Sequence, residues 1–387
     1  MRILFLSILT TVLLSSCSLR DSDYLPDFVD DRTNLVQLAE DDIDVKTIEL
    51  VKSLVFRDSL MLDEIPAITV DETGNLFMAG EAWNRSDVYL FDPYGERIES
   101  FTNSHSDDIT LSEIVNLQIA KDHLLVFDGH HNTVYKLHMD NGSLEESKKL
   151  DTSILTDYDS TDQFDIKPLR MFEDGSLLIQ INDIRNPSYF PNREIRYYKT
   201  DFTQSESVEH LFSQKGANYL IGDYAGRPAP FLLSKPERSL LAFDGRDRIY
   251  DAWSEHFYVK VLNSDGLIKK LFYMPFERAD LDRDGVIHPM FSHNDQILRV
   301  RESAVYPEKW PALYSVVADN SESIWISTIT NDEEKLQWYI IQNDDIYATF
   351  SWPFDKPIYE IKNGFVYTVE SNSNGFKEVV RYEIAGL

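Results

Sequence analysis

The chain has 387 residues, of which 66 are acidic and 37 are basic, so its formal net charge is −29 at pH 7. This charge argues against nucleic acid as a partner, because binding to phosphate backbones depends on clustered lysine and arginine and no basic run offsets the repulsion. The single cysteine excludes an intrachain disulfide. The length exceeds that of a usual single-core domain and indicates either two domains or one repeat architecture.

The N-terminus begins with Arg2, followed by an apolar run that ends at Leu14. This run is shorter than the roughly 20 residues that span a bilayer, and it fits a secretory signal. The sequence Leu14-Ser15-Ser16-Cys17 resembles the bacterial lipobox. The resemblance implies that residues 1–16 are removed and that Cys17 is acylated as the first mature residue. The alternative is an ordinary signal with an incidental cysteine.

An acylated Cys17 would make the membrane a partner through the lipid anchor and place the protein in the cell envelope. Ser18 stands where an aspartate can retain lipoproteins at an inner membrane, so an outer-membrane location is favoured, on its periplasmic or surface face. Residues 17–44 are acidic and are expected to form an extended, solvated tether, with an export tag as the alternative. The protein is expected to be a monomer.

Short alternating segments rich in Val, Ile, Tyr, Phe and Trp dominate from Val45 onward and are separated by turn residues, which predicts β-structure throughout. The segments recur as six units of four strands, a pattern typical of a β-propeller. The units are recognised at residues 65–101, 117–142, 173–198, 239–266, 316–341 and 358–384. Residues 45–387 are therefore predicted to form one all-β, six-bladed propeller.

The sixth unit ends after its third strand, whereas Thr47–Phe56 reads as a strand without a unit of its own. Pairing these two segments would close the ring and remove an open sheet edge. The sequence therefore predicts that an N-terminal strand completes the last blade.

The turns and strands of residues 45–387 resemble NHL-type repeats and the six-bladed β-propeller lipoproteins of bacteria. In the fifth unit, Pro307–Leu313 leads into Asp319 and then Ile324-Trp325-Ile326, which is similar to a recurrent start of one blade in that family. The glycine that the family places after Asp319 is absent here. The resemblance implies the fold, and it raises an enzymatic alternative, because similar propellers host lactonases and lyases that use a metal ion at the mouth of the central channel.

Residues 275–306 form a long insertion between the fourth and fifth units, in which the spacing over Phe291–Glu302 predicts a short helix. The helix is expected to pack over one face of the ring, with a mobile lid as the alternative. The same insertion holds Asp280, Asp282 and Asp284 at the spacing of an EF-hand calcium loop. Position 12 of that loop is Phe291 rather than glutamate, so a solvated acidic loop is favoured over a calcium site and no cofactor is expected.

Five residues are candidates for ligand binding at the channel mouth: Asp128, His130, His131, Asp244 and Arg246. Both aspartates lie in a Phe-Asp-Gly sequence and are expected to follow the second strands of two blades. The favoured alternative is that they only cap turns. The adjacent histidines point to opposite sides of an extended chain, which is awkward for one metal ion. No catalytic residue and no metal ligand is assigned.

Together these observations predict a lipid-anchored, extracytoplasmic propeller that acts as a binding or scaffolding protein for an unknown protein or small molecule. The alternative is a metal-dependent hydrolase or lyase, lactonase-like, with its site at the mouth of the central channel. The two classes differ in what they require. An enzyme of this kind brings metal ligands from several blades to one pocket, whereas a binding module presents a mixed surface.

Overall fold

The fold was analysed in a computed structural model of the chain. The structure describes residues 26, 29, 33–39, 45–56, 61–82, 85–101, 111–150, 164–183, 193–201, 208–281 and 295–386. Strands dominate these residues, and α1 (Asp295–Ser303) is the one helix among them. No helix in this part of the chain is long and apolar enough to cross a membrane. The all-β prediction is confirmed.

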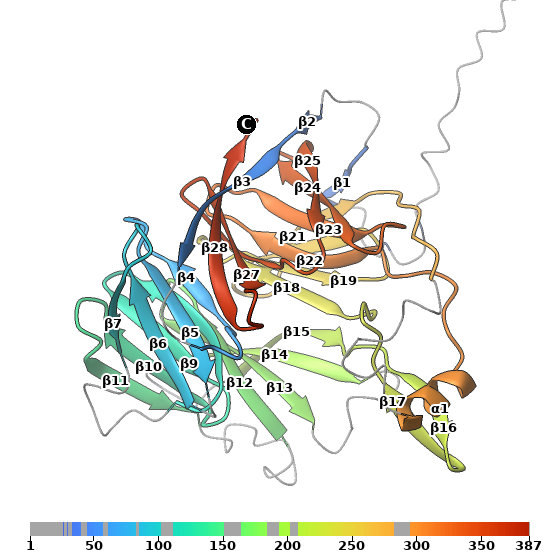
Figure 1. The fold of residues 1–387 in the computed structure, drawn as a ribbon, viewed down its shortest axis with the longest axis horizontal. Coiled ribbons are helices and arrows are strands. Elements are labelled where there is room, and N and C mark those ends of the chain that lie inside the picture. Colours follow the sequence, from blue (N-terminus) through green and yellow to red (C-terminus); the bar gives the residue numbers. More distant parts are fainter. Residues whose placement is uncertain are drawn as a thin grey trace, which may run out of the picture.

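Six antiparallel sheets form the blades of a β-propeller (Figure 1). Blades 1 and 2 contain β4 (Ile68–Val70), β5 (Leu76–Ala82), β6 (Arg85–Phe91), β7 (Arg97–Ser100), β8 (Ile114–Ala120), β9 (His123–Asp128), β10 (Thr133–His138) and β11 (Leu144–Lys149). Blades 3 and 4 contain β12 (Phe164–Met171), β13 (Ser176–Asp183), β14 (Glu194–Asp201), β15 (Val208–Lys215), β18 (Ser239–Phe243), β19 (Ile249–Trp253), β20 (Tyr258–Leu262) and β21 (Ile268–Tyr273). Blades 5 and 6 contain β22 (Leu313–Ala318), β23 (Ile324–Ile329), β24 (Lys335–Gln342), β25 (Asp345–Pro353), β26 (Ile358–Lys362), β27 (Phe365–Ser371), β28 (Lys377–Ala385) and β3 (Glu49–Phe56).

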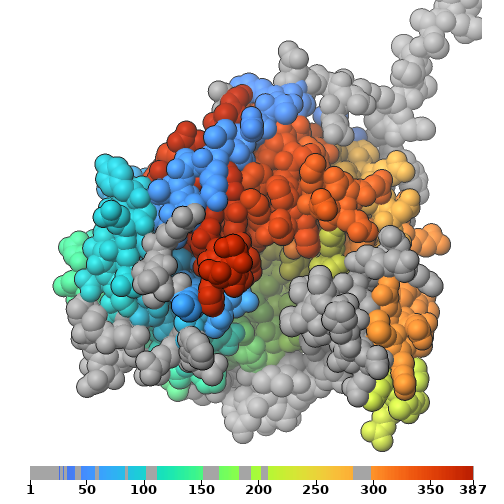
Figure 2. Space-filling view, viewed as in Figure 1, coloured from blue at the N-terminus to red at the C-terminus, as the bar shows by residue number. Residues whose placement is uncertain are grey.

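The N-terminal strand β3 completes blade 6, as the sequence predicted. It pairs antiparallel with β28, with Val55 opposite Val380 and Phe56 opposite Val379. Figure 2 shows the blue N-terminal strand lying against the red C-terminal blade. The ring is therefore closed by hydrogen bonds between the two ends of the propeller sequence, with β28 paired on both edges and β3 as the outer strand of blade 6.

The chain before β3 also adds strands to the outer edges of two blades. β1 (Leu35–Gln37) runs parallel to β21 of blade 4, and β2 (Lys46–Thr47) runs parallel to β25 of blade 5. Residues 17–44 were expected to be a solvated tether, yet residues 33–39 of this segment are docked on the propeller. The reason is local composition, because Leu35, Val36 and the buried Leu38 cover apolar surface at the edge of blade 4.

The predicted helix between blades 4 and 5 is present as α1. It packs against a hairpin that the sequence analysis did not anticipate, formed by β16 (Leu220–Tyr224) and β17 (Arg227–Phe231) between blades 3 and 4. An added Cβ at Gly222 of β16 would collide with the carbonyl oxygen of Val300 in the helix. Glycine is therefore required for the close approach of α1 to the hairpin.

One turn design recurs between strands of several blades. In six described turns the side-chain oxygen of an aspartate or asparagine accepts hydrogen bonds from the backbone N–H groups two and four residues later. The capping residues are Asp71, Asp92, Asp244, Asn263, Asp319 and Asn372. Glycine holds the left-handed position three residues after the cap in four of these turns, whereas Asp247 and Glu322 hold it in the other two.

The inner strands surround the central channel and fix its shape. They are β4, β8, β12, β18, β22 and β26, the first strand of each blade. Neighbouring inner strands pack against each other around the ring, and the weakest packing is between β12 and β18. Blades 3 and 4 therefore stand further apart at the channel than the other neighbouring blades.

Replacement of Phe56 should test the closure of the ring. The Phe56 ring is buried between Phe91, at a centroid distance of 6.0 Å, and Tyr367, at 6.1 Å. Phe56→Ala should lower the free energy of unfolding by about 3–5 kcal/mol, because it leaves a cavity where β3 meets blade 1. Val51→Ala is the matched control on the same strand, since Val51 is 46% exposed, and should change it by less than about 0.5 kcal/mol. Equal losses in urea titrations of the two variants would contradict the closure.

Candidate functional site

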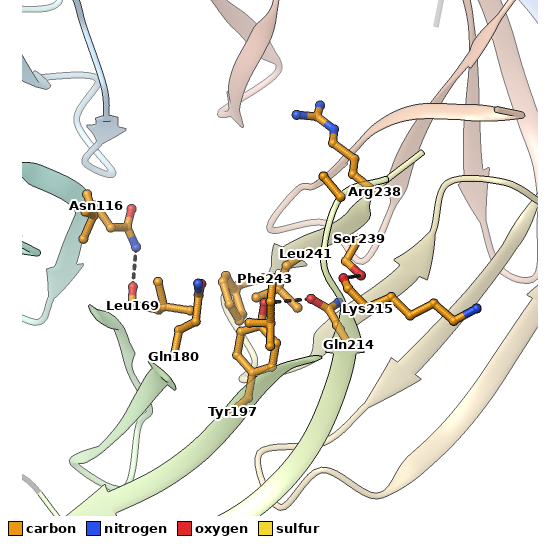
Figure 3. A pocket seen from close by; sticks show the side chains of 13 residues that line it. Asn116, Leu169, Gln180, Tyr197, Gln214, Lys215, Arg238, Ser239, Leu241 and Phe243 are labelled. Carbon is orange, nitrogen blue, oxygen red and sulfur yellow. Dashed lines mark hydrogen bonds between the residues drawn. The ribbon is translucent and has the colours of Figure 1, made fainter. Parts of the chain in front are cut away.

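A cavity of about 540 Å³ opens at the widened junction of blades 3 and 4 (Figure 3). Its walls come from β8, β12, β13, β14, β15 and β18, so three blades contribute side chains. The apolar part of the wall is formed by Val115, Leu169, Ile195, Leu241 and Phe243. These side chains are all half-buried. The cavity thus presents apolar surface to a ligand at the channel.

Two of these apolar residues reach the cavity through β-bulges. Pairing of β12 with β13 skips Leu169, and pairing of β8 with β9 skips Val115. The bulge in β12 also frees the carbonyl oxygen of Leu169, which accepts a hydrogen bond from Asn116 Nδ2 at 2.7 Å. Bulges that turn a side chain out of the regular alternation are typical of functional sites.

Two polar side chains of the cavity wall, Tyr197 and Gln214, belong to a hydrogen-bonded chain that ends at the buried Asp251, which does not itself line the cavity. Tyr197 donates to Gln214 Oε1 at 2.7 Å, and Gln214 Nε2 donates to Asp251 Oδ1 at 2.6 Å (the first bond is drawn in Figure 3). Burial raises the pKa of Asp251, and the hydrogen bond from Gln214 opposes this shift. The chain joins blade 3 to blade 4 and satisfies the buried polar groups between them.

The charged residues that line the cavity are both cationic. Arg238 donates to the carbonyl oxygen of Tyr314 at 3.2 Å and lies 5.5 Å from the centre of the Tyr314 ring. Lys215 lies 5.4 Å from the centre of the Trp253 ring. Among the described residues, no aspartate or glutamate lines this cavity. In a chain with a net charge of −29, this local reversal favours an anionic or neutral ligand over a cation.

An acidic cluster lies on blades 1 and 2 near the start of their inner strands. Burial raises the pKa of Glu81, and the neighbouring carboxylates of Glu64 and Glu113 raise it further, although Ser86 donates a hydrogen bond that opposes them. Glu113 also forms an ion pair with Lys167 of blade 3 at 2.7 Å. The Glu113–Lys167 pair therefore links the acidic cluster to blade 3.

Two further charges occupy inner strands of blades 3 and 6. Burial raises the pKa of Glu360 in β26 to about 7, while Lys362 and Arg170 act to lower it. Arg170 in β12 donates to the carbonyl oxygen of Asp244 at 2.5 Å. Since the Arg170 guanidinium lowers the pKa of a carboxyl on a non-adjacent blade, the two groups interact across the channel. The channel interior thus contains a carboxyl group poised to titrate near neutral pH.

The sequence-predicted candidate Asp128 has its carboxylate fully occupied by local contacts. It accepts hydrogen bonds from the backbone N–H of Ser112 and of His131, both at 2.9 Å, and lies 3.1 Å from His131 Nδ1. These are the contacts of the turn-cap alternative. The His130 and His131 rings meet edge to face, with centroids 4.9 Å apart. Ligand binding by His130 and His131 stays a prediction.

Asp244 is one of the six turn caps described above, and its carboxylate also binds Arg248 Nε at 2.5 Å and Tyr250 OH at 3.2 Å. Arg246 forms an ion pair with Glu322 of blade 5. The expectation that Asp128 and Asp244 are equivalent was wrong. Asp128 ends β9, a second strand, whereas Asp244 follows β18, an inner strand. Because these strands are antiparallel within a blade, the two residues lie at opposite faces of the propeller.

The calcium loop considered in the sequence is only partly described. Asp280 forms an ion pair with Lys309 at 2.5 Å, which occupies one of the three candidate carboxylates. Asp282 and Asp284 lie outside the described residues, as do Cys17 and the signal segment. Among the residues that are described, the one group of three potential metal ligands is His123, His138 and Glu145 on blade 2.

Several solved structures are similar to the chain at low sequence identity. No family model and no curated protein matches the chain. Among solved structures, it is similar to a candidate exported protein from Bacteroides fragilis NCTC 9343, with 10% identity over 91% of this chain and 99% of that chain and a TM-score of 0.49. It is also similar to a luciferin-regenerating enzyme (10% identity, 87% and 95% covered, TM-score 0.45) and to a streptogramin B lyase (11% identity, 87% and 98% covered, TM-score 0.42). At these identities the likeness concerns the fold alone.

The cavity residues were not found in the sequence. Gln214 lies in one segment and Arg238 and Leu241 lie in another, and both segments are of unremarkable composition. The one local signal was a departure from strand alternation at Leu169, where Pro168 precedes a residue that breaks the pattern of the inner strand. The cavity forms at a widened junction, and the width of that junction depends on the spacing of the blades. Local sequence patterns do not predict this spacing.

Replacement of Glu360 should change the pH dependence of stability. The folded-state pKa of about 7 exceeds the ordinary value of 4.5 for a glutamate, so ionisation opposes folding as the pH rises between these values. Glu360→Gln should therefore be more stable than the wild type by about 3 kcal/mol at pH 8 and equally stable near pH 4. Urea unfolding at both pH values measures this. Exposed Glu383→Gln is the control, and a pH-independent effect of Glu360→Gln would contradict the assignment.

Proposed function

We propose that this chain is a lipid-anchored binding protein of the cell envelope that takes a small ligand into the cavity between blades 3 and 4. The observation that carries the proposal is the cavity itself. Its volume of about 540 Å³ lies within the range of roughly 300–1,000 Å³ that is typical of small-molecule sites. Apolar walls with a few polar groups are likewise typical of such sites.

The lining supports a ligand with an apolar body and an acidic or strongly polar end. Leu169, Leu241 and Phe243 supply apolar contact, and the lining also carries amides and a phenol. Arg238 is the side chain that would meet an acidic group, because its guanidinium retains donors beyond the one that binds Tyr314. A carboxylate could then form a charge-assisted hydrogen bond at the rim.

The binding function is better supported than the metal-dependent alternative. A hydrolase or lyase of the lactonase type would need metal ligands from several blades at the channel mouth. In the described part of the chain, the acidic cluster of Glu64, Glu81 and Glu113 does not form a group at metal-ligand distances, and Glu113 is engaged by Lys167.

The envelope location rests on the lipobox-like Leu14-Ser15-Ser16-Cys17 sequence. Acylation of Cys17 would tether the propeller to a membrane, and the absence of aspartate at Ser18 supports the outer membrane. In this arrangement the protein would act as a monomeric receptor or scaffold on the periplasmic or surface face.

The ligand class can be tested with decanoate and with decanol, its uncharged counterpart. Isothermal titration of the purified chain should show decanoate binding with one site, and Leu241→Trp should abolish it by filling the cavity. Arg238→Gln should weaken decanoate binding by about tenfold, as expected for one charge-assisted hydrogen bond at a partly exposed site, and should leave decanol binding unchanged. Leu267→Trp is the control, because Leu267 is exposed on a distant turn at 58%. Binding that survives Leu241→Trp would contradict the assignment to this cavity.

Lipidation can be tested by expression with radiolabelled palmitate in a Gram-negative host. The wild type should be labelled and recovered in the membrane fraction, whereas Cys17→Ala should be unlabelled and should leave that fraction. Ser18→Asp is the matched control, since it should keep the label and move the protein toward the inner membrane. Membrane recovery of an unlabelled wild type would refute the anchor without affecting the ligand site.

A further inference from the structure

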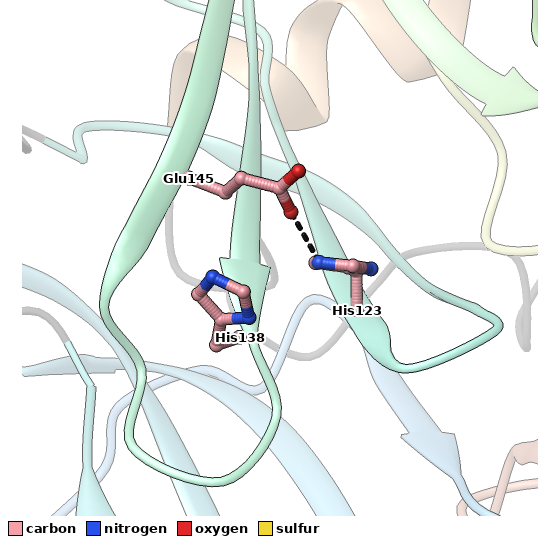
Figure 4. Close-up of side chains that lie close together, drawn as sticks. All are labelled: His123, His138 and Glu145. Carbon is pink, nitrogen blue, oxygen red and sulfur yellow. Dashed lines mark ion pairs between the residues drawn. The ribbon is translucent and has the colours of Figure 1, made fainter.

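Three potential metal ligands meet at one end of blade 2, on adjacent strands (Figure 4). His123 begins β9 and His138 ends β10, and the two residues are direct partners in the register of the hairpin. Their ring centroids are 4.9 Å apart. Glu145 follows on β11, and the ligand atoms of the three side chains lie within 4.8 Å of one another.

A β-bulge brings Glu145 to the two histidines. In the pairing of β10 with β11, Lys136 lies opposite Glu146 and Leu137 lies opposite Leu144, so Glu145 is the extra residue. Without the bulge, successive side chains of β11 would keep pointing to alternate faces of the sheet at this position. The extra residue instead directs its carboxylate to His123, with which it forms an ion pair.

A second carboxylate orients the imidazole of His123. Asp122 Oδ1 lies 2.7 Å from His123 Nδ1, so Nδ1 carries the hydrogen in the neutral ring and donates it to Asp122. The lone pair of Nε2 is then left to face Glu145. A carboxylate that holds the outer nitrogen of a ligating histidine in this way is the usual second shell of zinc sites.

The Nε2 nitrogen of His123 lacks a hydrogen-bond partner within the described part of the chain. The residue is only 9% exposed, and its Nε2 atom is buried without a hydrogen-bond partner of acceptable geometry in the described structure. The neutral Nε2 and the Glu145 carboxylate are both acceptors, so they can face each other favourably only with a cation between them. Either a proton or a metal ion can take that place.

We propose that His123 Nε2, a ring nitrogen of His138 and the carboxylate of Glu145 bind one divalent transition-metal ion of the zinc type. Two imidazoles and one carboxylate are a donor set that zinc accepts, and three protein ligands leave a fourth position for water. Ligand atoms around tetrahedral zinc are about 3.3 Å apart, given zinc–nitrogen distances near 2.0–2.1 Å. Rotation of the exposed His138 and Glu145 side chains suffices to close the site from the present spacing.

The site is independent of the proposed ligand cavity. It lies on the second, third and fourth strands of blade 2, whereas blade 2 contributes to the cavity through its inner strand β8. A bound ion would cross-link β9, β10 and β11 at the end of the blade. Metal binding there is therefore expected to stabilise the fold rather than to act on a ligand in the channel.

The competing explanation is that His123 is an imidazolium held between Asp122 and Glu145. Glu145 also forms an ion pair with Lys136 at 3.0 Å, so a proton and a lysine could together neutralise the site. This explanation requires no contribution from His138. The dependence of metal binding on His138 therefore separates the two.

The experiment uses the full mature chain, freed of metal with a chelator and then titrated with Zn²⁺ by calorimetry and with Co²⁺ by absorption spectroscopy. One equivalent of Zn²⁺ should bind, Co²⁺ should give the intense visible bands of tetrahedral coordination, and Zn²⁺ should raise the Tm. His138→Ala and Glu145→Gln should each weaken binding by at least 100-fold. Asp122→Asn should weaken it by about 10- to 100-fold, as is typical of an outer-shell partner.

His210→Ala is the matched control, because His210 is an exposed histidine on a strand of blade 3, and it should bind Zn²⁺ as the wild type does. Circular dichroism checks that each variant is folded, and Glu145→Gln serves if His138→Ala is not. Absence of a stoichiometric site, or binding that is unchanged in folded His138→Ala or Glu145→Gln, would overturn the proposal. Neither result would bear on decanoate binding in the cavity.

Discussion

The pairing of β3 with β28 is the constraint on which the rest of the structure depends. Blade 6 has only three strands of its own at the C-terminus, so the ring closes only when residues 49–56 supply the fourth. Closure places all six inner strands around one channel. The same N-terminal segment pairs with the outer edges of blades 4 and 5 before it reaches blade 6. Three blades are thereby held by one short stretch of chain, whose strands β1, β2 and β3 form the outer edges of blades 4, 5 and 6.

The cavity lies at the junction where neighbouring inner strands pack least closely. Neighbouring inner strands pack closely around most of the ring, and the remaining space opens between β12 and β18. Tyr197 and Gln214 form part of the cavity wall there and are connected by hydrogen bonds to Asp251 of blade 4. A buried carboxyl with a raised pKa is tolerated there because its partner satisfies it. The result is an apolar recess with cationic lining in a strongly acidic protein.

The acidity of the chain is explained in part by turn chemistry. Aspartate and asparagine cap six described turns by accepting two backbone hydrogen bonds each, which accounts for residues such as Asp71 and Asp319 without any ligand. Asp244 belongs to this set, so its Phe-Asp-Gly context is structural. By contrast, the carboxylates of Asp122 and Glu145 converge on a buried histidine. Carboxylates that converge on one side chain therefore indicate a candidate binding site in this protein. The number of carboxylates in the sequence does not indicate one.

The sequence by itself determined the all-β class, the six units, the closing strand and the short helix of the insertion. Each of these follows from local alternation, turn residues and a count of strands, which are properties of neighbouring residues. Tertiary structure alone decided the docking of β1 in the presumed tether, the β16–β17 hairpin and the opposite placement of Asp128 and Asp244. It also decided both candidate sites. The cavity joins side chains from three blades, and the His123–His138–Glu145 group depends on hairpin register and one bulge. Distances between residues far apart in sequence arise from register and blade spacing, and these are set by packing across the whole ring rather than by any local pattern.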